Sequence, residues 1–290
     1  MPLPPRTDSL SDELLLCGRH EVRVLEGVAE SARVTFSYRL ADAPELGPQQ
    51  RELMAWFHST DEIKPVDGGQ RFLITSVGGC AAFLDRQTRG LRVFAWADGL
   101  HSAELLPGGL VVLAVSHPTD QGAPGDGNRL ALYDPRRPFA ELWSEPFVSA
   151  HAVVWDDSRG VLWALGREEL RVYRLARRGD EGPRLERESS AALPATGGHD
   201  LQAVPGTPDL LLSVSGGAYL FDRDTRLFRP HALLGATPLI KSVSVHPRTG
   251  RIAVVQAEAA HGSYAGRILL YEPQGVCPVP GPPVYKARWC

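Results

Sequence analysis

Polar and apolar residues follow one recurring order along most of the chain. Each unit begins with a polar residue, passes through a short strand pattern and a Pro-, Gly- or Asp-rich turn, and ends in a strongly apolar strand pattern. The units read DEIKPVDGGQRFLITS from Asp61, HSAELLPGGLVVLAVS from His101, HAVVWDDSRGVLWALG from His151, HDLQAVPGTPDLLLSVSG from His199 and KSVSVHPRTGRIAVVQ from Lys241. They start about 40–50 residues apart, which is the period of a four-stranded propeller blade.

Two further strand patterns complete each unit, as in CAAFLDR followed by LRVFAWA. The chain ends supply a sixth unit, because ELLLCG, HEVRVLEG and ARVTFSYRL read as second, third and fourth strands and VYKARW, residues 284–289, as the first. We therefore predict an all-β protein, a single six-bladed β-propeller over residues 1–290, with residues 1–11 as a flexible tail. Pairing of the C-terminal strand with the N-terminal strands closes the ring and removes exposed sheet edges. The segment from Gln49 to His58 is expected to form a short helix or a loop.

Composition narrows the class of protein. The chain is 43% apolar with a formal net charge of -3, which excludes global disorder and argues against a nucleic-acid partner. It shows no basic leader and no run of about 18 apolar residues, so we expect a cytoplasmic protein without a membrane partner. The stretch Leu14–Gly18 could be mistaken for a lipoprotein cleavage site, but acidic residues precede it. Four widely spaced cysteines contain no C-x-x-C pair, which excludes a zinc knuckle and disfavours a disulfide framework.

Polar residues begin the strands that line the channel of a propeller. Counted back from the turns, His101, His199 and Asp61 align, whereas His151 and Lys241 fall one residue later, beside Glu62. A slip of one residue reverses the direction of a side chain, and a bulge at the start of the strand would correct it. His246, by contrast, lies in the turn HPRTG and is expected on the opposite face as an ordinary turn residue.

More charged residues follow on the same strands. Lys64, Glu104 and Gln202 align three residues further on, and Lys286 and Arg288 come from the closing strand. One interpretation is that these groups form salt bridges across a wet channel and hold the blades in register. The other is a polar site at the channel mouth. Loop length favours the second, because the long loops 116–128 and 257–266 belong to the same face, and they add His261 and Tyr264 as further candidates.

These residues predict acid–base chemistry. We expect an enzyme of the lyase, isomerase or cyclase type that acts on a small anionic or oxygen-rich molecule, a sugar acid or a natural-product intermediate. The predicted catalytic residues are His101, His151, His199 and Lys241, and the predicted substrate-binding residues are Glu62, Lys64, Glu104, Asp200, Gln202, Lys286 and Arg288. Cationic side chains would hold an anion, Arg288 bidentately, and a histidine would transfer protons. Oligomeric state is not predicted.

Two alternatives remain open. The propeller could be a non-catalytic scaffold that binds a ligand or a protein. It could also be a divalent-metal-dependent lyase with His101, His151 and His199 as ligands, although no local ligand motif is present and the neighbouring lysines would repel a cation. We therefore predict no cofactor, with a divalent metal as the possible exception. The sequence also contains no nucleophile elbow, Walker loop or dinucleotide fingerprint.

Several strings resemble a known family. LHSAELLPGG, AHAVVWDDSRGVLWALG, GHDLQAV, IKSVSVHPRTGRIAVVQAE and YKARW look like an uncharacterised family of bacterial and fungal six-bladed propellers, from about Asp61 to Trp289. The resemblance implies the fold and a shared site at the channel mouth, and no settled activity. Leu100 stands where a proline is usual in the family. More distantly the chain resembles lactonase-like and TolB-like propellers, but the carboxylate and Asn metal set of the lactonases is not recognisable, so lactonase activity is not carried over.

Overall fold

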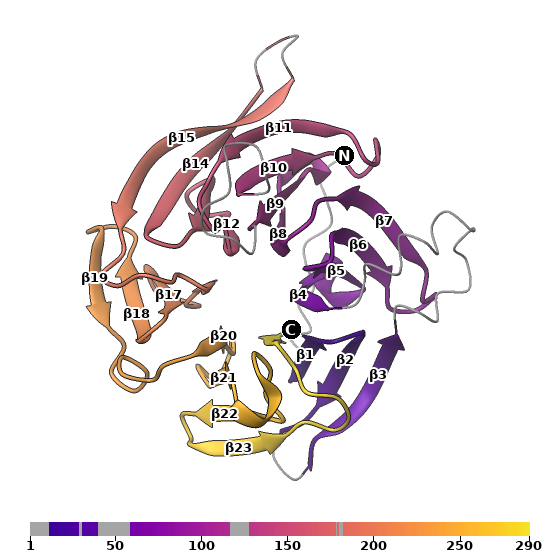
Figure 1. Cartoon of the computed structure of the whole chain (residues 1–290), viewed down its shortest axis with the longest axis vertical. Helices are drawn as coiled ribbons and strands as arrows, with labels where there is room; N and C mark the ends of the chain where they lie inside the picture. Colours follow the sequence, from indigo (N-terminus) through magenta and orange to yellow (C-terminus); the bar gives the residue numbers. More distant parts are fainter. Residues whose placement is uncertain (1–11, 29–30, 40–58, 117–127, 178, 180–181) are drawn as a thin grey trace.

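Six four-stranded antiparallel sheets stand around a central axis like the blades of a propeller (Figure 1). The computed structural model describes residues 12–28, 31–39, 59–116, 128–177, 179 and 182–290. In each blade a short first strand lies nearest the axis and a fourth strand forms the outer edge. This arrangement confirms the predicted all-β six-bladed propeller. The segment from Gln49 to His58, the tail 1–11 and most of the loop 116–128 lie outside the described residues.

Five blades follow the chain in order. The first two consist of β4 (Thr60–Val66), β5 (Arg71–Ser76), β6 (Cys80–Asp85) and β7 (Leu91–Trp96), and of β8 (Leu100–Leu105), β9 (Val111–Val115), β10 (Arg129–Tyr133) and β11 (Glu141–Pro146). The next two consist of β12 (Ala152–Asp156), β13 (Val161–Leu165), β14 (Glu169–Arg177) and β15 (Pro183–Ala192), and of β16 (Asp200–Ala203), β17 (Asp209–Val214), β18 (Gly217–Asp222) and β19 (Leu227–Pro230). The fifth consists of β20 (Ile240–Val245), β21 (Ile252–Gln256), β22 (Arg267–Tyr271) and β23 (Gly275–Pro278). Among the described residues, short 3-10 turns occupy the connections at Asp67–Gly69, Pro107–Gly109 and Ala259–His261.

The remaining blade joins the two ends of the chain. Its order is β24-β1-β2-β3, where β1 (Glu13–Gly18), β2 (Glu21–Glu26) and β3 (Arg33–Arg39) are N-terminal and β24 (Lys286–Trp289) is C-terminal. Strand β24 pairs with β1 so that Trp289 lies opposite Leu14 and Lys286 opposite Cys17. The predicted ring closure is therefore confirmed, and the C-terminus lies at the centre of the molecule beside β1 (Figure 1).

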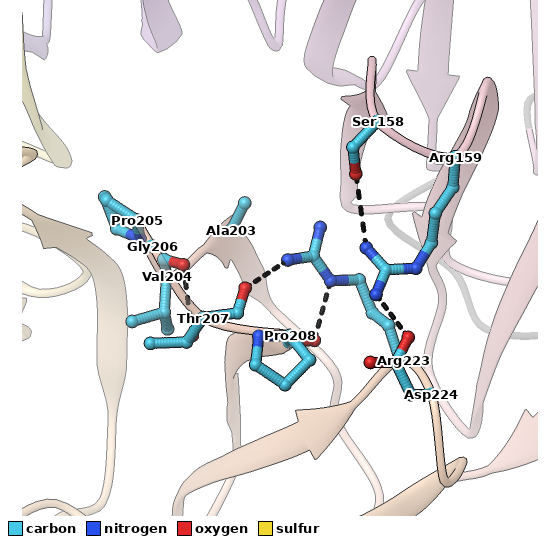
Figure 2. A pocket seen from close by; sticks show the side chains of 10 residues that line it. All are labelled: Ser158, Arg159, Ala203, Val204, Pro205, Gly206, Thr207, Pro208, Arg223 and Asp224. Carbon is cyan, nitrogen blue, oxygen red and sulfur yellow. Dashed lines mark hydrogen bonds and ion pairs between the residues drawn. The ribbon is translucent and has the colours of Figure 1, made fainter.

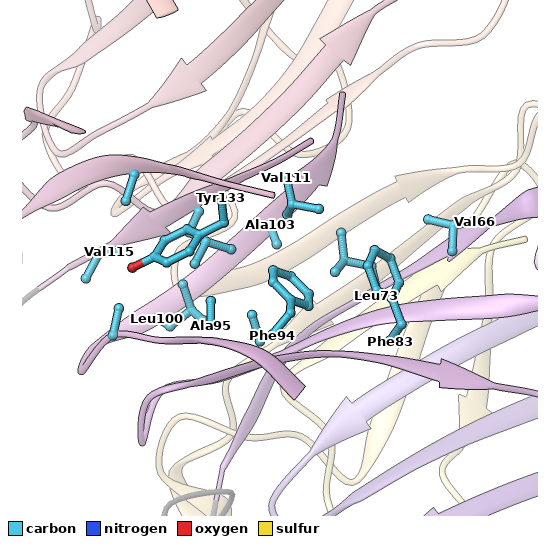
Figure 3. Close-up of a cluster of buried hydrophobic side chains, with 14 residues drawn as sticks. Val66, Leu73, Phe83, Phe94, Ala95, Leu100, Ala103, Val111, Val115 and Tyr133 are labelled. Atoms are coloured by element: carbon cyan, nitrogen blue, oxygen red, sulfur yellow. The ribbon is translucent and has the colours of Figure 1, made fainter. Parts of the chain in front are cut away.

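Apolar side chains fill the space between neighbouring blades. Figure 3 shows one such layer, in which Phe83 and Phe94 stack at 5.2 Å and Tyr133 comes from the adjoining blade. Trp163, 1% exposed, packs edge-on against Phe221 of the following blade. Burial of these layers fixes the blades side by side and leaves the first strands to line the channel. All four cysteines are free, and Cys17, Cys80 and Cys277 are buried. Within the described ranges, no helix is long and apolar enough to cross a membrane.

Candidate functional site at the channel mouth

The first strands of three blades begin with a bulge that adds one residue. On β4, β8 and β20 the pairing with the second strand shifts across Asp61, His101 and Lys241. In each case the extra residue and the one after it lie opposite a single partner residue. A bulge of this kind bends the strand and redirects the extra side chain.

The other three blades have the same geometry. The amide of His151 donates to Leu165 O at 2.9 Å although Leu165 already pairs with Ala152. His199 N donates to Ser213 O, and Tyr285 N to Cys17 O, in the same two-against-one arrangement. Each blade therefore contributes one residue to a single circle around the axis. We name the circle the channel-mouth ring: Asp61, His101, His151, His199, Lys241 and Tyr285.

This geometry corrects the sequence-based register. Counting from the turns placed His151 and Lys241 beside Glu62, whereas the structure places them level with Asp61. The bulge considered as a correction is present at Lys241, and at His151 the residue lies directly before the first paired residue of β12. Tyr285 was missed because an aromatic residue before an inner strand looks like core. Its signal was available, since Tyr285 precedes Lys286 as His199 precedes Asp200.

The three histidines lie side by side. The rings of His101 and His151 stack with centroids 4.1 Å apart, and those of His151 and His199 lie 4.7 Å apart. His101 Nδ1 hydrogen-bonds to Asp61 Oδ2, and His151 Nδ1 lies 3.1 Å from Ser149 O. The adjacent rings are thus held by different partners at their edges.

Burial sets the protonation of this group. It lowers the pKa of His151 and of His199 well below 6.5, and neighbouring histidine and lysine charges lower both further. Burial also raises the pKa of Tyr285 well above 10.0. His151 and His199 are therefore neutral imidazoles at neutral pH, and the Tyr285 hydroxyl is protonated. The Tyr285 hydroxyl and His199 Nε2 are hydrogen-bonded at 2.8 Å, and the tautomer of His199 decides which of the two donates.

Lys241 completes the ring with a positive charge. Its side chain is half-buried, with Nζ 6.0 Å from the centroid of the Tyr285 ring. Burial lowers the pKa of Lys241 from 10.5, while the nearby carboxylate of Asp61 acts in the opposite direction. Over the described part of the chain, Lys241 makes no hydrogen bond or ion pair with an acceptor. Its ammonium group is therefore available to an anion at the mouth.

Below the ring lies a dry network of charges. Arg288 Nε donates to Glu62 Oε1 at 2.9 Å and Arg288 Nη2 to Asp200 Oδ1 at 2.6 Å, while Lys286 Nζ lies 3.3 Å from Glu62 Oε2. All four side chains are at most 2% exposed. Burial alone would raise the pKa of Glu62, but Arg288 and Lys286 outweigh it and hold that pKa far below 4.5. The network is charge-balanced and fully paired.

A second pair lies deeper on β4 and β8. Lys64 Nζ lies 2.7 Å from Glu104 Oε2 and also donates to the Val153 carbonyl of the next blade. Burial raises the pKa of Glu104, although Lys64 opposes the shift. Gln202 is half-buried at the corresponding step of β16. These residues tie three first strands together below the ring.

Two serines add contacts that sequence reasoning missed. Ser102 Oγ donates to Glu62 Oε2 at 3.0 Å, and Ser149 Oγ lies 3.2 Å from His151 Nδ1. Ser149 has a φ of 49°, a left-handed conformation that is costly for a residue with a Cβ. Such strain persists only where the surroundings require it, here beside His151. No motif in the sequence marks either serine.

Tyr264 and His261, the further candidates on the loop 257–266, differ in whether they reach the site. Tyr264 reaches the site, because its hydroxyl is 2.7 Å from Ser59 Oγ and its ring centroid is 5.9 Å from that of Tyr285. The guanidinium of Arg19 lies over the Tyr264 ring at 4.2 Å. His261 instead lies 3.8 Å from Glu258 within its own loop. Tyr264 therefore borders the ring and His261 belongs to the loop.

The imidazoles do not converge on a common point. The rings of His101 and His151 are stacked, and the ring of His199 is tilted by 36° against that of His151. Asp61, Ser149 and Tyr285 each occupy one ring nitrogen. In the portion of the chain that the structure describes, no group of three His, Cys, Asp or Glu residues is arranged to hold a metal ion. The geometry of the residues present does not fit a three-histidine metal centre.

The opposite face has a hollow of a different kind. A pocket of about 470 Å³ lies between the β12–β15 and β16–β19 blades and contains Arg159 and Arg223 (Figure 2). Arg223 donates to Asp156 Oδ2 and to the carbonyls of Thr207 and Pro208, each at 2.7 Å. Arg159 pairs with Asp224 and Asp156. Because both arginines are engaged, this pocket has no free charge for a ligand.

Fold and ring together define a six-bladed β-propeller with a polar, partly unpaired site at one end of its channel. Comparison with known families then identifies the chain: it belongs to the family of unknown function DUF6528, whose model matches residues 46–290. The expected membership of an uncharacterised propeller family is thereby confirmed. No curated protein matches the chain.

Proposed function

We propose that the channel-mouth ring is the active site of an enzyme that acts on a small anionic or oxygen-rich molecule. The reaction type is proton abstraction beside an anionic group, as in a lyase, isomerase or cyclase. The observation that carries the proposal is the combination of an unpaired ammonium group, Lys241, with a carboxylate-held imidazole, His101, in one ring. The exposed edge of the His101 imidazole is open to a ligand, since this side chain is 16% exposed.

His101 is the general base in this proposal. Asp61 accepts a hydrogen bond from Nδ1–H, which leaves the lone pair of Nε2 free to take a proton from substrate carbon. The same bond stabilises the imidazolium that forms. Asp61 is therefore a positioning residue that favours one tautomer of His101.

Lys241 stabilises the charge that develops. When the C–H bond breaks, its electron pair moves to the adjacent carbonyl oxygen, and the proton goes to Nε2 of His101. An ammonium group in a partly buried site stabilises the resulting enolate more strongly than water does. Return of the proton to a neighbouring carbon gives isomerisation, and loss of a leaving group from that carbon gives elimination.

Tyr285 and His199 provide the second proton path. The phenol and neutral His199 share a hydrogen bond, so the pair can pass a proton along the channel-mouth ring toward a leaving group. His151 is neutral and lies between the other two imidazoles, where its contacts with both rings keep them in place.

The paired charges below the ring have a different role in the proposal. Glu62, Asp200, Lys286 and Arg288 have no remaining exposed charge and form a rigid platform under the ring. We assign them to positioning the first strands. The same reasoning applies to Lys64 and Glu104.

Hydrogen–deuterium exchange at carbon tests the proposal without knowledge of the full reaction. Galacturonate and 2-oxoglutarate are incubated with the protein in D₂O, and loss of the C–H signal beside the carboxylate or carbonyl is followed by NMR. We expect protein-dependent exchange that is lost in His101→Ala and retained in His20→Ala, an exposed histidine outside the ring. Equal exchange in both variants would refute the assignment of His101. Saturable binding without exchange would favour the non-catalytic binding propeller.

A further inference from the structure

An arginine on the β1–β2 turn lies at the channel mouth and has no role in the proposed chemistry. In the closing blade β1 is the second strand and β2 the third, so the turn between them belongs to the face of the channel-mouth ring. Two hydrogen bonds fix this turn beside Asp61. Arg19 O accepts from Thr60 N at 2.7 Å, and Gly18 N donates to Thr60 Oγ1 at 2.7 Å. The backbone of Arg19 is therefore held next to the start of β4.

Aromatic contacts connect the guanidinium of Arg19 with the channel-mouth ring. Its Cζ lies 4.2 Å from the centroid of the Tyr264 ring. The Tyr264 centroid in turn lies 5.9 Å from that of Tyr285, and Lys241 Nζ lies 6.0 Å from the Tyr285 centroid. Two cationic groups, Arg19 and Lys241, thus border the same mouth and are connected through two tyrosine rings.

Comparison with similar arginines shows that the charge of Arg19 is unpaired. Arg19, Arg89 and Arg226 are all exposed, have a left-handed φ of 55°, 60° and 62°, and lie over an aromatic ring. Arg89 Nη2 also donates to Ser37 O at 2.7 Å, and Arg226 Nη1 to Ser189 Oγ at 3.2 Å. The guanidinium of Arg19 has no acceptor among the residues that the structure describes.

The carboxylates beside these residues already have partners. Asp61 is bound to His101, and Glu258 pairs with Arg267 Nε at 2.8 Å. Contact with an aromatic face orients a guanidinium without neutralising its charge, and it leaves the N–H edge free. Arg19 is therefore suited to a ligand carboxylate, which a guanidinium can bind through two parallel hydrogen bonds.

We propose that Arg19 binds a second anionic group of the substrate, so that the substrate class of the channel-mouth ring is a small dicarboxylate. Lys241 lies at the reacting end of this molecule, and Arg19 binds the distal carboxylate. The inference rests on the proposed function and narrows it, because a monoanion would leave Arg19 without a partner. Arg19 is a specificity-determining residue and takes no part in proton transfer.

Four 2-oxo acids test the proposal at low ionic strength, where an exposed ion pair is least screened. 2-Oxoglutarate and 2-oxoadipate carry a distal carboxylate at two different lengths, and 2-oxopentanoate and 2-oxohexanoate have a methyl group in its place. Isothermal titration should show at least one dianion bound about tenfold more tightly than its monoanion counterpart. Equal affinity within both pairs, or no binding of any of the four acids, would overturn the proposal.

Two glutamine variants assign the preference to one residue. Arg19→Gln should remove the preference for the dianion and leave the affinity for the monoanions unchanged. Arg89→Gln is the matched control and should retain the preference, because Arg89 has a similar backbone conformation and aromatic contact on the opposite face. A preference that survives in Arg19→Gln, or that is lost equally in Arg89→Gln, would contradict the assignment.

Carbon exchange in D₂O separates this inference from the function on which it rests. If the acids exchange their C3 protons in a His101-dependent manner but show no preference that depends on Arg19, the inference fails and the proposed function stands. If the preference depends on Arg19 but no acid exchanges, the proposed catalysis fails and the dicarboxylate site stands.

Discussion

Polar residues at the centre of this propeller differ in how completely they are paired. Glu62 and Arg288 are fully hydrogen-bonded inside the protein, to each other and to Asp200, Lys286 and Ser102. Asp61 is bound to His101 on one side, and Lys241 has no acceptor among the described residues. Incomplete pairing leaves a group free to act on a ligand, whereas complete pairing stabilises the fold. Burial adds a second distinction, because it keeps His151 and His199 neutral.

Replacement of Asp61 tests the positioning of His101. Asp61→Asn retains the size of the side chain and removes the carboxylate that fixes the tautomer. We expect the carbon-exchange rate to fall by about 10² or more, with little change in ligand affinity. Asp67→Asn is the control, since Asp67 is an exposed residue that pairs with Arg71 on the opposite face. An unchanged rate in Asp61→Asn would contradict the role given to this carboxylate.

Lys241 predicts a characteristic pH dependence. Only its charged form holds an anion, and burial lowers its pKa, so affinity should fall as pH rises and should do so below the value of about 10.4 of an ordinary lysine. Titration of galacturonate at increasing pH measures this. Lys241→Arg, which stays charged, should keep its affinity over the same range. Identical pH profiles for the lysine and arginine forms would show that Lys241 does not hold the anion.

At the scale of the element, the first strand of each blade has two structural roles. The residue at its start, which is a bulge residue on β4, β8 and β20, presents one polar side chain at the mouth, and its later residues alternate between the channel and the interblade core. On β4 this alternation places Glu62 and Lys64 toward the channel and buries Ile63 between blades. On β24 the alternation places Lys286 and Arg288 toward the channel and buries Ala287 between blades.

Loss of Arg288 should destabilise the first strands. Arg288→Met leaves Glu62 and Asp200 buried with only Lys286 to balance them. We expect the free energy of unfolding to fall by about 3–5 kcal/mol, as for other broken buried ion pairs. Denaturant unfolding measures it. Arg33→Met, which removes an exposed pair with Glu26, should change it by no more than about 0.5 kcal/mol. Equal effects of the two variants would show that the buried network contributes no special stability.

At the scale of the whole molecule, closure of the ring places Tyr285 in the site. Strand β24 joins β1, and the residue before it enters the channel-mouth ring. The buried pairs of Arg288 then link this closing strand to β4 and β16. The last strand thus contributes to both stability and the proposed chemistry.

Gly18 is the point where this closure is tightest. A Cβ at residue 18 would lie 2.7 Å from Val284 Cα and 2.8 Å from Tyr285 N, both backbone atoms. Gly18→Ala should therefore lower the free energy of unfolding by about 1–3 kcal/mol and reduce exchange activity through displacement of Tyr285. Gly216→Ala is the control, because a Cβ there meets nothing within 4 Å. If both variants unfold at the same denaturant concentration, the packing of β1 against the segment before β24 is looser than the structure indicates.

Local patterns made much of this predictable. His101, His151 and His199 could be identified because a polar residue that opens a buried strand breaks the apolar pattern. The offset of His151 and Lys241 could not be resolved, since a bulge depends on pairing with the neighbouring strand. Tyr285 could have been identified by its position before Lys286, but its contact with His199 could not, because only the position of the closing strand puts its hydroxyl beside that imidazole.

The sequence by itself determined the number of blades, their strand order and the closure of the ring, because period, alternation and turn residues are local properties of the chain. Tertiary structure alone decided which polar residues are paired and which are free. Glu62 and Arg288 are 226 positions apart in the chain, and Asp200 and Arg288 are 88 apart. Interactions between such distant residues, and the burial that sets their protonation, exist only once the blades have closed around the axis.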